Sequence, residues 1–574
     1  MRCRYPGFCA PLGALLFATA LAACGSVGSG NGHGALSEVA LGRRIYRHGV
    51  GTDGKPIQAF SQHDIAMVGG QAACINCHRP SGLGSNEGGY YVPPINAPLL
   101  YAPRKLDRLR LFPSLYHQIQ PQRFKHRLYQ PRMRPAYTRD SLGKTLRTGI
   151  DPGGNTLAAI MPRYQISAAD VAALDAYLHT LSAHIDPGVT ATEIRLATVF
   201  SDNVPASQRE AMLSLMREYV SYYNLNRRED LARGRFSPYN RSEFVPIQRA
   251  WTLSVWELKG DASTWRAQLE NYYRKDKVFA LIGGKVRGSW TGPAAFCNAH
   301  HLPYLFPDTE LPAWPPKPYG YTVYFDAGLA LEAQVTANFL ADGVAGSDSV
   351  MQLAAADDYG RLPARVFQQT LGKLEPRVKV QQLTFHGRTD LEHDLRSLHG
   401  NFNRILVVWP GEDVAGAIAA LAAVRPDAAL IFLPSRAIDA VKKQAFSADF
   451  ASAFRFADPY ELDPSSHVKS YETRAWMLTR RLDLSHPTLM FEEYYAMSLL
   501  QAAVFEISND YYRDYLLERV EDESQKDLNP GVFPKLALGP GERFAAKGAY
   551  IVRLDPDRKP SGLSRVSDWI TPTS

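Results

Sequence analysis

The sequence contains little cysteine, with six residues among 574. Two of them, Cys3 and Cys9, lie at the extreme N-terminus and Cys297 stands alone, so no disulfide framework can be assembled. Low-complexity and collagen-like compositions are excluded, because 45% of the residues are hydrophobic and 21% are charged. The chain contains no GxSxG or HExxH sequence and so gives no sign of the common hydrolytic sites. Its length instead predicts several folded domains.

The N-terminus has the pattern of an export signal. A basic start is followed by an apolar stretch, Pro11–Ala20, which is too short for a stable transmembrane helix, and then by small residues up to Ser26. This pattern resembles a bacterial lipoprotein signal peptide of residues 1–23, which implies cleavage before Cys24 and lipidation of that thiol. An ordinary secretory signal that leaves Cys24 unmodified is the alternative. We expect a lipid-anchored periplasmic protein whose residues 24–35 form a flexible tether.

A haem-attachment motif occurs at residues 74–78, which read Cys-Ile-Asn-Cys-His. This CxxCH sequence is the signature of covalent c-type haem attachment. Two thiols at this spacing reach the two vinyl groups on one edge of a porphyrin, and the adjacent imidazole can bind the iron. A structural zinc site would need four Cys or His ligands, and a thioredoxin-like CxxC would follow a buried strand. We therefore predict one covalent haem c, attached through Cys74 and Cys77, with His78 as an iron ligand.

The sixth iron ligand must come from elsewhere in the chain. A methionine thioether in this position favours ferrous iron and raises the potential. Met133 and Met161 are the methionines placed to serve between His78 and the end of this domain, and we choose Met161. Met133 remains an alternative, as does a histidine such as His117 or His126.

Four segments resemble a class I cytochrome c when taken in order. They are Gly42–Tyr46, the CxxCH motif, Leu146–Gly154 and Met161–Tyr164. The resemblance covers residues 36–184 and implies an all-α domain, in which a terminal helix capped by Ser167 crosses an N-terminal helix at Leu36–Arg47. One departure is the separation of His78 and Met161, which is longer than the family commonly uses.

A basic segment interrupts this domain between Pro103 and Arg139. It contains ten Lys or Arg residues and one acid, Asp107, whereas the whole chain has a formal charge of only +7. The rest of the chain is therefore net negative. The segment is expected to dock an acidic redox partner or anionic lipid headgroups, and the alternative is a solvated loop that neutralises haem propionates. Nucleic acid is not an expected partner outside the cytoplasm.

The second half of the chain has an α/β pattern. After a linker at residues 185–192, apolar runs alternate with helical segments, which predicts parallel sheets covered on both faces. The phrases at residues 277–284, 301–307 and 357–360 resemble the type I periplasmic solute-binding fold, in particular branched-chain amino-acid binding proteins. The resemblance implies two lobes within residues 193–556, three crossings of the chain between them, and a C-terminal tail at residues 557–574.

The same resemblance implies a ligand cleft at the carboxyl ends of the strands. Its candidate residues are Gly283, Gly284, Ser289, Asp308, Thr309, Tyr359 and Glu412, with Ser435 and Arg436 as weaker ones. The first cleft loop departs from the amino-acid binders because it carries Lys285, Arg287 and Trp290. A bulkier or more anionic ligand would suit these side chains. The alternative is that the two cations face solvent and Trp290 packs in the core.

Together these patterns predict an electron-transfer protein with a fused small-molecule-binding module, more an electron carrier than a catalyst. Two alternatives remain open at this point. In one, the chain is a solute-binding or sensing lipoprotein in which the haem is regulatory. In the other, it is a haem enzyme resembling a peroxidase, which requires that Met161 does not bind the iron.

Overall fold

The computed structural model describes most of the chain from residue 36 onward. The described ranges are 36–87, 90–104, 133–234, 248–343, 349–398, 404–444, 446–463, 468–526, 528–558 and 561–572. The predicted signal peptide, the lipidation site Cys24, the tether and both alternative histidine ligands, His117 and His126, lie outside these ranges. Among the described residues, none of the helices combines the length and the hydrophobicity that crossing a bilayer requires.

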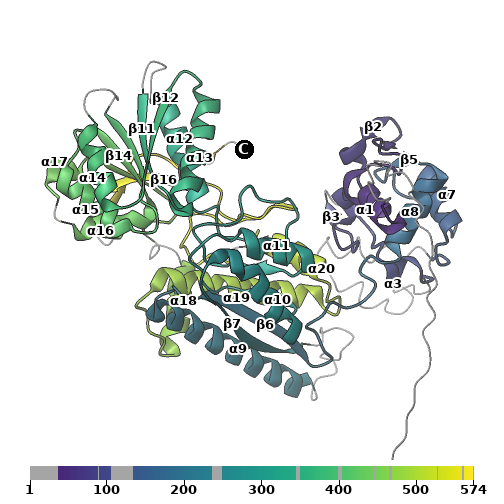
Figure 1. Ribbon diagram of the computed structural model, residues 1–574. Coiled ribbons are helices and arrows are strands. Elements are labelled where there is room, and N and C mark those ends of the chain that lie inside the picture. The colour runs from purple at the N-terminus through teal and green to yellow at the C-terminus, as the bar shows by residue number, and fades with distance from the viewer. Residues whose placement is uncertain are drawn as a thin grey trace, which may run out of the picture.

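The first module, residues 36–184, is mainly helical (Figure 1). Its helices are α1 (Glu38–His48), α2 (Ile75–His78), α3 (Ala97–Leu100), α7 (Arg139–Thr148) and α8 (Ala168–Leu178), with a short 3-10 turn at Gly69–Ala72. Its strands are β1 (Gln58–Ser61), β2 (Ile65–Val68), β3 (Asn86–Glu87), β4 (Tyr90–Tyr91) and β5 (Arg163–Gln165). They form an antiparallel sheet in the order β2-β1-β5 and a separate β3-β4 pair. The expectation of an all-α domain is therefore wrong in this detail.

Helices α1 and α8 cross at a point where their backbones nearly touch. A Cβ atom added to Gly42 of α1 would lie 1.9 Å from the carbonyl oxygen of Ala173 in α8. Helix α8 begins with the predicted capping box, in which Ser167 Oγ accepts from the Asp170 amide and the Asp170 carboxylate accepts from the Ser167 amide. The expected crossing of terminal and N-terminal helices is thus present.

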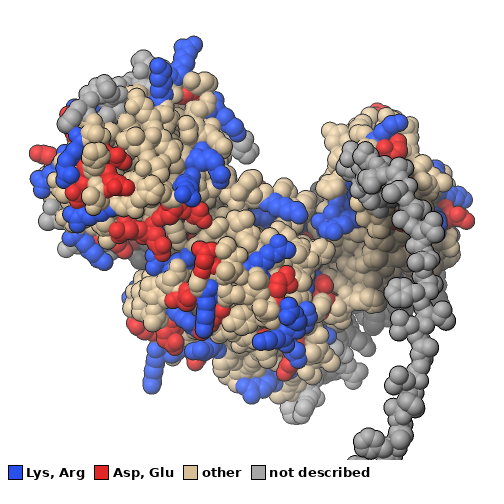
Figure 2. All heavy atoms as spheres, viewed as in Figure 1, with Lys and Arg blue, Asp and Glu red and all other residues tan. Residues whose placement is uncertain are grey.

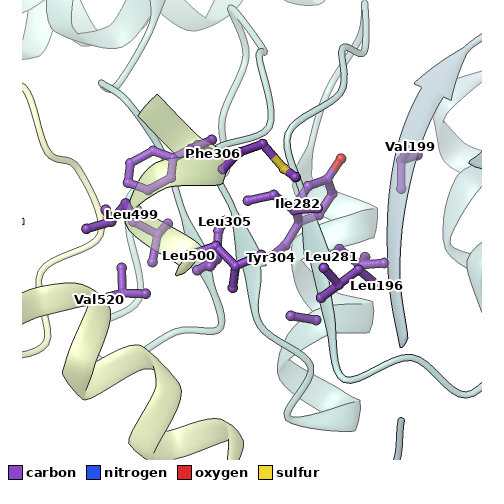
Figure 3. Packing of buried hydrophobic residues seen from close by; sticks show 14 of the residues in the cluster. Leu196, Val199, Leu281, Ile282, Tyr304, Leu305, Phe306, Leu499, Leu500 and Val520 are labelled. Carbon is purple, nitrogen blue, oxygen red and sulfur yellow. The ribbon is translucent and has the colours of Figure 1, made fainter. Parts of the chain in front are cut away.

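The second module contains two α/β lobes. The sheet of the first lobe is parallel, in the order β10-β9-β8-β6-β7, and consists of β6 (Glu193–Ser201), β7 (Ala250–Leu258), β8 (Ala280–Ile282), β9 (Tyr304–Leu305) and β10 (Thr322–Val323). Its helices are α9 (Ala206–Gly234), α10 (Trp265–Lys275), α11 (Thr291–His300), α18 (Val468–Thr479), α19 (Pro487–Ile507) and α20 (Arg513–Glu523). Figure 3 shows the core where residues of β6, β8 and β9 meet those of α19 and α20.

The sheet of the second lobe has the order β12-β11-β13-β14-β15-β16-β17. The strands are β11 (Ser349–Ala355), β12 (Lys379–Phe385), β13 (Ile405–Trp409), β14 (Leu430–Pro434), β15 (Phe454–Asp458), β16 (Tyr550–Leu554) and β17 (Leu563–Arg565), of which the last two are antiparallel. The helices are α12 (Leu329–Ala341), α13 (Asp358–Leu374), α14 (Arg388–Ser397), α15 (Val414–Val424), α16 (Ile438–Lys443) and α17 (Ala448–Ala451).

The chain passes between the lobes three times. It leaves the first lobe after β10, returns to it with α18, and enters the second lobe again at β16. The expected two-lobed α/β architecture is therefore confirmed. The expected tail at residues 557–574 instead contains β17, whose Leu563 is buried, so the second lobe extends past residue 556.

Candidate functional site

The predicted haem motif forms a single helical turn. Cys74 immediately precedes α2, and the amides of Cys77 and His78 donate to the Cys74 carbonyl oxygen at 3.3 and 2.9 Å. Residues three and four positions apart lie on the same face of such a turn, so the two thiols and the imidazole start from one side of the backbone. No disulfide joins Cys74 and Cys77.

The imidazole of His78 is prepared to act as a metal ligand. It is 4% exposed, and its Nδ1 lies 3.1 Å from the carbonyl oxygen of Pro93. Since a carbonyl only accepts, this contact places the ring proton on Nδ1 and leaves the lone pair on Nε2. Burial lowers the pKa of His78 to about 4, although the Pro93 carbonyl opposes this shift. The ring is thus neutral at physiological pH, as metal binding requires.

The side chains of this motif match the donor set of a covalently attached haem, which needs two thiols and one imidazole. Within the described ranges, no group of three or more His, Cys, Asp or Glu side chains is placed to hold a metal. Burial also raises the pKa of the Cys74 thiol to about 12, which keeps it protonated in the absence of a partner.

Met161 lies in a segment that approaches the haem motif. Two residues after it, Arg163 pairs with Phe60 of β1, and Tyr164 donates from its hydroxyl to the Ala72 carbonyl oxygen at 3.0 Å. The Met161 side chain is half-buried against the same apolar cluster that contains Cys74. By contrast, Met133 is 48% exposed. Of these two methionines, only Met161 packs against this cluster.

The sequence analysis missed Met67 because it considered only methionines after His78. Met67 lies in β2 and is also half-buried against the cluster that contains Cys74. Met67 lies in a short strand shortly before the motif, where a methionine is typical of ordinary packing. The sequence alone therefore gave no indication of a functional role for it.

The basic segment is only partly described, since residues 105–132 lie outside the described ranges. Arg134 is 7% exposed, and its guanidinium donates to the carbonyl oxygens of Leu99, Leu100 and Ala102. Arg139 pairs with the buried Asp175 at 3.3 Å. Arg134 supports the loop structure and does not belong to an exposed docking face.

On the first lobe, the predicted cleft glycines are covered by a side chain of the protein itself. Gly283 and Gly284 follow β8 with positive φ angles of 51° and 77°. The Gly284 amide donates to Glu493 Oε2 at 3.1 Å, and a Cβ on Gly283 would lie 1.7 Å from Glu493 Oε1. Burial raises the pKa of Glu493 to about 8. A carboxyl group of α19 therefore occupies the space next to this turn.

The other residues of the first cleft loop are mostly paired or buried. Lys285 donates to Asp308 at 2.6 Å, and the side chains of both are 17% exposed, so neither charge is free and Lys285 does not face solvent. Trp290 is fully buried and packs edge-on against Tyr304. The interpretation of Trp290 as a cleft aromatic is wrong, and its alternative as a core residue is confirmed.

The two lobes meet at Arg436, Tyr359 and Glu310. Arg436, from the 3-10 turn after β14, lies with its Cζ 4.3 Å from the centre of the Tyr359 ring. Its Nε is 3.4 Å from Glu310 Oε1, which belongs to the loop after β9 in the first lobe. The Arg436 side chain is only 10% exposed, yet its Nη1 has no hydrogen-bond partner among the described residues. Arg436 thus presents a nearly buried guanidinium at the contact between the two lobes.

Burial and the nearby Glu310 raise the pKa of Tyr359, so its hydroxyl remains protonated and able to donate. Arg287 lowers the pKa of Tyr359 and Glu412 raises it, so charged side chains of both lobes influence this hydroxyl. The sequence pattern indicated Arg436 only as a weaker candidate for the ligand cleft and gave no prediction for Glu310. The only signal for Glu310 was its position directly after Thr309.

The remaining candidates have local roles. Thr309 Oγ1 accepts from the Leu311 amide at 3.2 Å, and Ser289 Oγ lies 3.1 Å from Thr291 Oγ1. Glu412 is exposed, and its amide donates to Asp357 Oδ2 at 2.7 Å. Of Thr309, Ser289 and Glu412, only Glu412 influences the pKa of Tyr359. Figure 2 shows that acidic and basic side chains lie together along this boundary.

Two cavities lie beside the elements described above. One of about 280 Å³ lies at the carboxyl ends of β11, β12 and β13, and its lining residues are Ala355, Ala356, Asp357, Phe385, His386, Gly387, Arg388, Pro410, Asp413 and Ala417. Two of its lining residues, Pro410 and Asp413, belong to the loop that carries Glu412. A larger one of about 710 Å³ lies between α9 and α19, away from the lobe boundary, and is lined in part by Tyr219, Tyr223, Gln501 and Phe505.

No family model and no curated protein matches this chain. Solved structures that are similar to it include a fatty acid ABC transporter substrate-binding protein from Thermomonospora curvata, at 13% identity and a TM-score of 0.45, covering 68% of this chain and 95% of that one. A leucine-binding protein from Thermotoga maritima is 13% identical with a TM-score of 0.45, covering 66% and 99%. A branched-chain amino acid ABC transporter protein from Thermus thermophilus with bound valine is 11% identical with a TM-score of 0.45, covering 67% and 97%.

Proposed function

We propose that this chain is an exported, lipid-anchored redox protein of the periplasm. Its first module carries one covalent haem c and transfers electrons, and its two-lobed module binds a small molecule. The observation that carries the redox part is the neutral, buried imidazole of His78, with its Nδ1 held by the Pro93 carbonyl oxygen and two cysteines on the same helical turn. The anchor rests on the sequence pattern that ends at Cys24.

A bound haem c would supply one-electron redox chemistry at its iron. Cys74 and Cys77 would attach it, since each S–H adds across one vinyl group and gives a thioether with the hydrogen on the vinyl carbon. His78 offers its Nε2 to the iron because Pro93 holds the opposite nitrogen. Met161 is the proposed sixth ligand because its segment packs against the apolar cluster that contains Cys74. An acidic redox partner is proposed for the basic segment.

The two-lobed module is proposed to bind a small molecule with an anionic group. Arg436 supports this class because its guanidinium lies against Tyr359, is nearly buried, and has a nitrogen without a hydrogen-bond partner among the residues that the structure describes. Buried donors without partners are costly, so a carboxylate that accepts from Arg436 would gain a strong charge-assisted bond. Lys285 is not proposed as a second receptor because Asp308 already neutralises it.

A second function is favoured by the contact between Arg436 and Glu310. This contact joins the two lobes, and a ligand that binds Arg436 would compete with Glu310 and could change the relation of the lobes. The chain would then be a solute-binding or sensing lipoprotein in which the haem has a regulatory role. The two functions differ in whether electron transfer continues in the absence of ligand.

The test of the electron-transfer function is a visible spectrum of the purified protein in both redox states. Oxidised protein with Met161 on the iron has a weak far-red thioether-to-iron band, which Met161→Ala removes and the control Met133→Ala retains. An exchangeable water on the iron of the unmodified protein would contradict the Met161 assignment and favour a peroxidase-like enzyme. A colourless protein would contradict the haem itself.

A further inference from the structure

The residue that follows His78 has a strained backbone. Arg79 ends α2 with φ of 64° and ψ of 169°, a region that residues other than glycine rarely occupy. Such a conformation persists only where surrounding contacts fix it. Two contacts do so here. The carbonyl oxygen of Arg79 accepts from the Tyr46 hydroxyl at 2.6 Å, and its guanidinium donates to Glu521 Oε2 at 2.5 Å.

Glu521 belongs to α20, more than 400 residues further along the chain and in the other module. Its second oxygen, Oε1, accepts from Arg543 Nη1 at 2.8 Å and from the Gly541 amide at 3.0 Å. Arg79, Glu521 and Arg543 are all about 5% exposed or less. A buried carboxylate thus lies between two buried guanidinium groups directly beside the proposed haem site.

A second carboxyl group of α20 fixes the same turn. Glu518 Oε1 accepts from the Ser81 amide at 2.6 Å, and its Oε2 accepts from the Ser81 hydroxyl at 2.8 Å. Glu518 is 1% exposed and Ser81 is fully buried. The turn Arg79–Ser81 is therefore held at both ends by one helix of the solute-binding module.

Helix α20 is itself rigidly attached to the first lobe. Leu516 and Val520 are fully buried in the core of that lobe. At its first residue, the guanidinium of Arg513 donates to the carbonyl oxygens of Val278 and Phe279, which lie directly before β8. Through Glu518 and Glu521, helix α20 therefore connects the haem turn to the sheet of the first lobe in the second module.

We propose that Glu521, together with Glu518, is a positioning residue for the haem. It holds the strained turn after His78 and places a fixed negative charge, balanced by Arg79 and Arg543, beside the cofactor. The redox properties of the haem are then set by the solute-binding module and not by the cytochrome module alone. This inference rests on the proposed function, because it requires that haem is attached.

The test compares midpoint potentials of the full-length, haem-bearing protein and four variants by spectroelectrochemical titration. A negative charge near the iron stabilises its ferric form, so Glu521→Gln is expected to raise the potential. Arg79→Gln, which removes a positive charge from the same contact, is expected to lower it. Arg79→Lys keeps the charge and should stay closer to the unmodified protein. The control is Glu523→Gln on the same helix, because Glu523 is also buried but pairs with Lys526.

A merely structural role for Glu521 would not produce shifts of opposite sign for the two partners of one ion pair. Opposite shifts with an unchanged Glu523→Gln variant support the inference. Unchanged potentials, or shifts of equal sign, in variants that carry haem overturn it and leave the proposed function intact. If Arg79→Gln does not mature with haem, the inference is decided by the midpoint potential of Glu521→Gln compared with that of Glu523→Gln. An unmodified protein that carries no haem overturns the proposed function instead.

Discussion

Arg436 of the second lobe lies with its Nε 3.4 Å from Glu310 Oε1 of the first lobe, while its guanidinium covers the ring of Tyr359. This pair brings together two residues that are 126 positions apart and belong to different lobes. At this contact Nη1 of Arg436 has no hydrogen-bond partner in the described part of the chain.

Replacing Arg436 is expected to remove ligand binding. Arg436→Gln should abolish the thermal stabilisation that small carboxylic acids give to the unmodified protein, because bound ligand stabilises the folded state by RT ln(1 + [L]/Kd). The measurement is a thermal-shift screen of a set of organic acids against the full-length protein. Arg404→Gln serves as the control, since Arg404 is an exposed residue of the same lobe that pairs with Asp427. Stabilisation that survives in Arg436→Gln would contradict the assigned receptor.

Glu310→Gln is expected to have the opposite effect. It removes the carboxylate that competes for Arg436, so the affinity for an anionic ligand should rise. Isothermal titration with an acid found in the screen measures this change. An affinity that falls in Glu310→Gln would show that Glu310 contributes to the ligand site and does not compete with the ligand.

The buried carboxyl of Glu493 gives a prediction about pH. Burial raises its pKa to about 8 from the ordinary value of 4.5, although the Gly284 amide opposes this shift. Between these two values the folded protein binds more protons than the unfolded chain, so stability falls as the pH rises through this window. The Glu493→Gln variant lacks this titration. From pH 4.5 to 8, the unfolding free energy of the unmodified protein should therefore fall relative to that of Glu493→Gln. Above pH 8 the difference between the two proteins should stay constant.

Denaturant unfolding at several pH values checks the prediction for Glu493. Other buried carboxyl groups titrate in the same range, among them Glu518, whose pKa burial also raises to about 8. The informative quantity is therefore the difference between the two proteins and not either curve alone. A difference that does not change with pH would show that Glu493 is ionised in the folded protein.

Gly42 gives a prediction about the first module. A Cβ at this position would lie 1.9 Å from the Ala173 carbonyl oxygen, and backbone atoms of α8 cannot move aside. Gly42→Ala should therefore destabilise the first module by about 1–3 kcal/mol or more, as overpacking does. Gly70→Ala is the matched control because nothing lies within 4 Å of its Cβ position. Equal stability of the two variants by thermal unfolding would contradict the close helix crossing.

Much of the architecture could be predicted from local patterns. The capping box at Ser167 and the apolar spacing after it predicted α8, and the alternation of apolar runs with helices predicted the parallel sheets. These features depend on residues a few positions apart, so a single sequence reveals them. The antiparallel β16 and β17 were not predicted, because no helix lies between them and they lack the alternation of strand and helix that marks the parallel strands.

The contacts that define the sites could not be predicted in this way. Glu493 lies about 210 residues from the glycine turn that it covers, and Glu521 lies 442 residues from Arg79. Charged residues on amphipathic helices usually face solvent, and nothing in the spacing of α19 or α20 distinguishes a buried acid from an exposed one. Only the tertiary arrangement reveals which carboxylates are buried and what they hold.

The proposed redox function depends on a porphyrin bonded to Cys74 and Cys77. Peptide mass spectrometry of the matured, exported protein tests it most directly, after digestion and treatment with a thiol-alkylating reagent. The account predicts that the peptide containing residues 74–78 carries the mass of one haem and that neither thiol reacts with the reagent. The account would be contradicted by a peptide of unmodified mass in which both cysteines are alkylated.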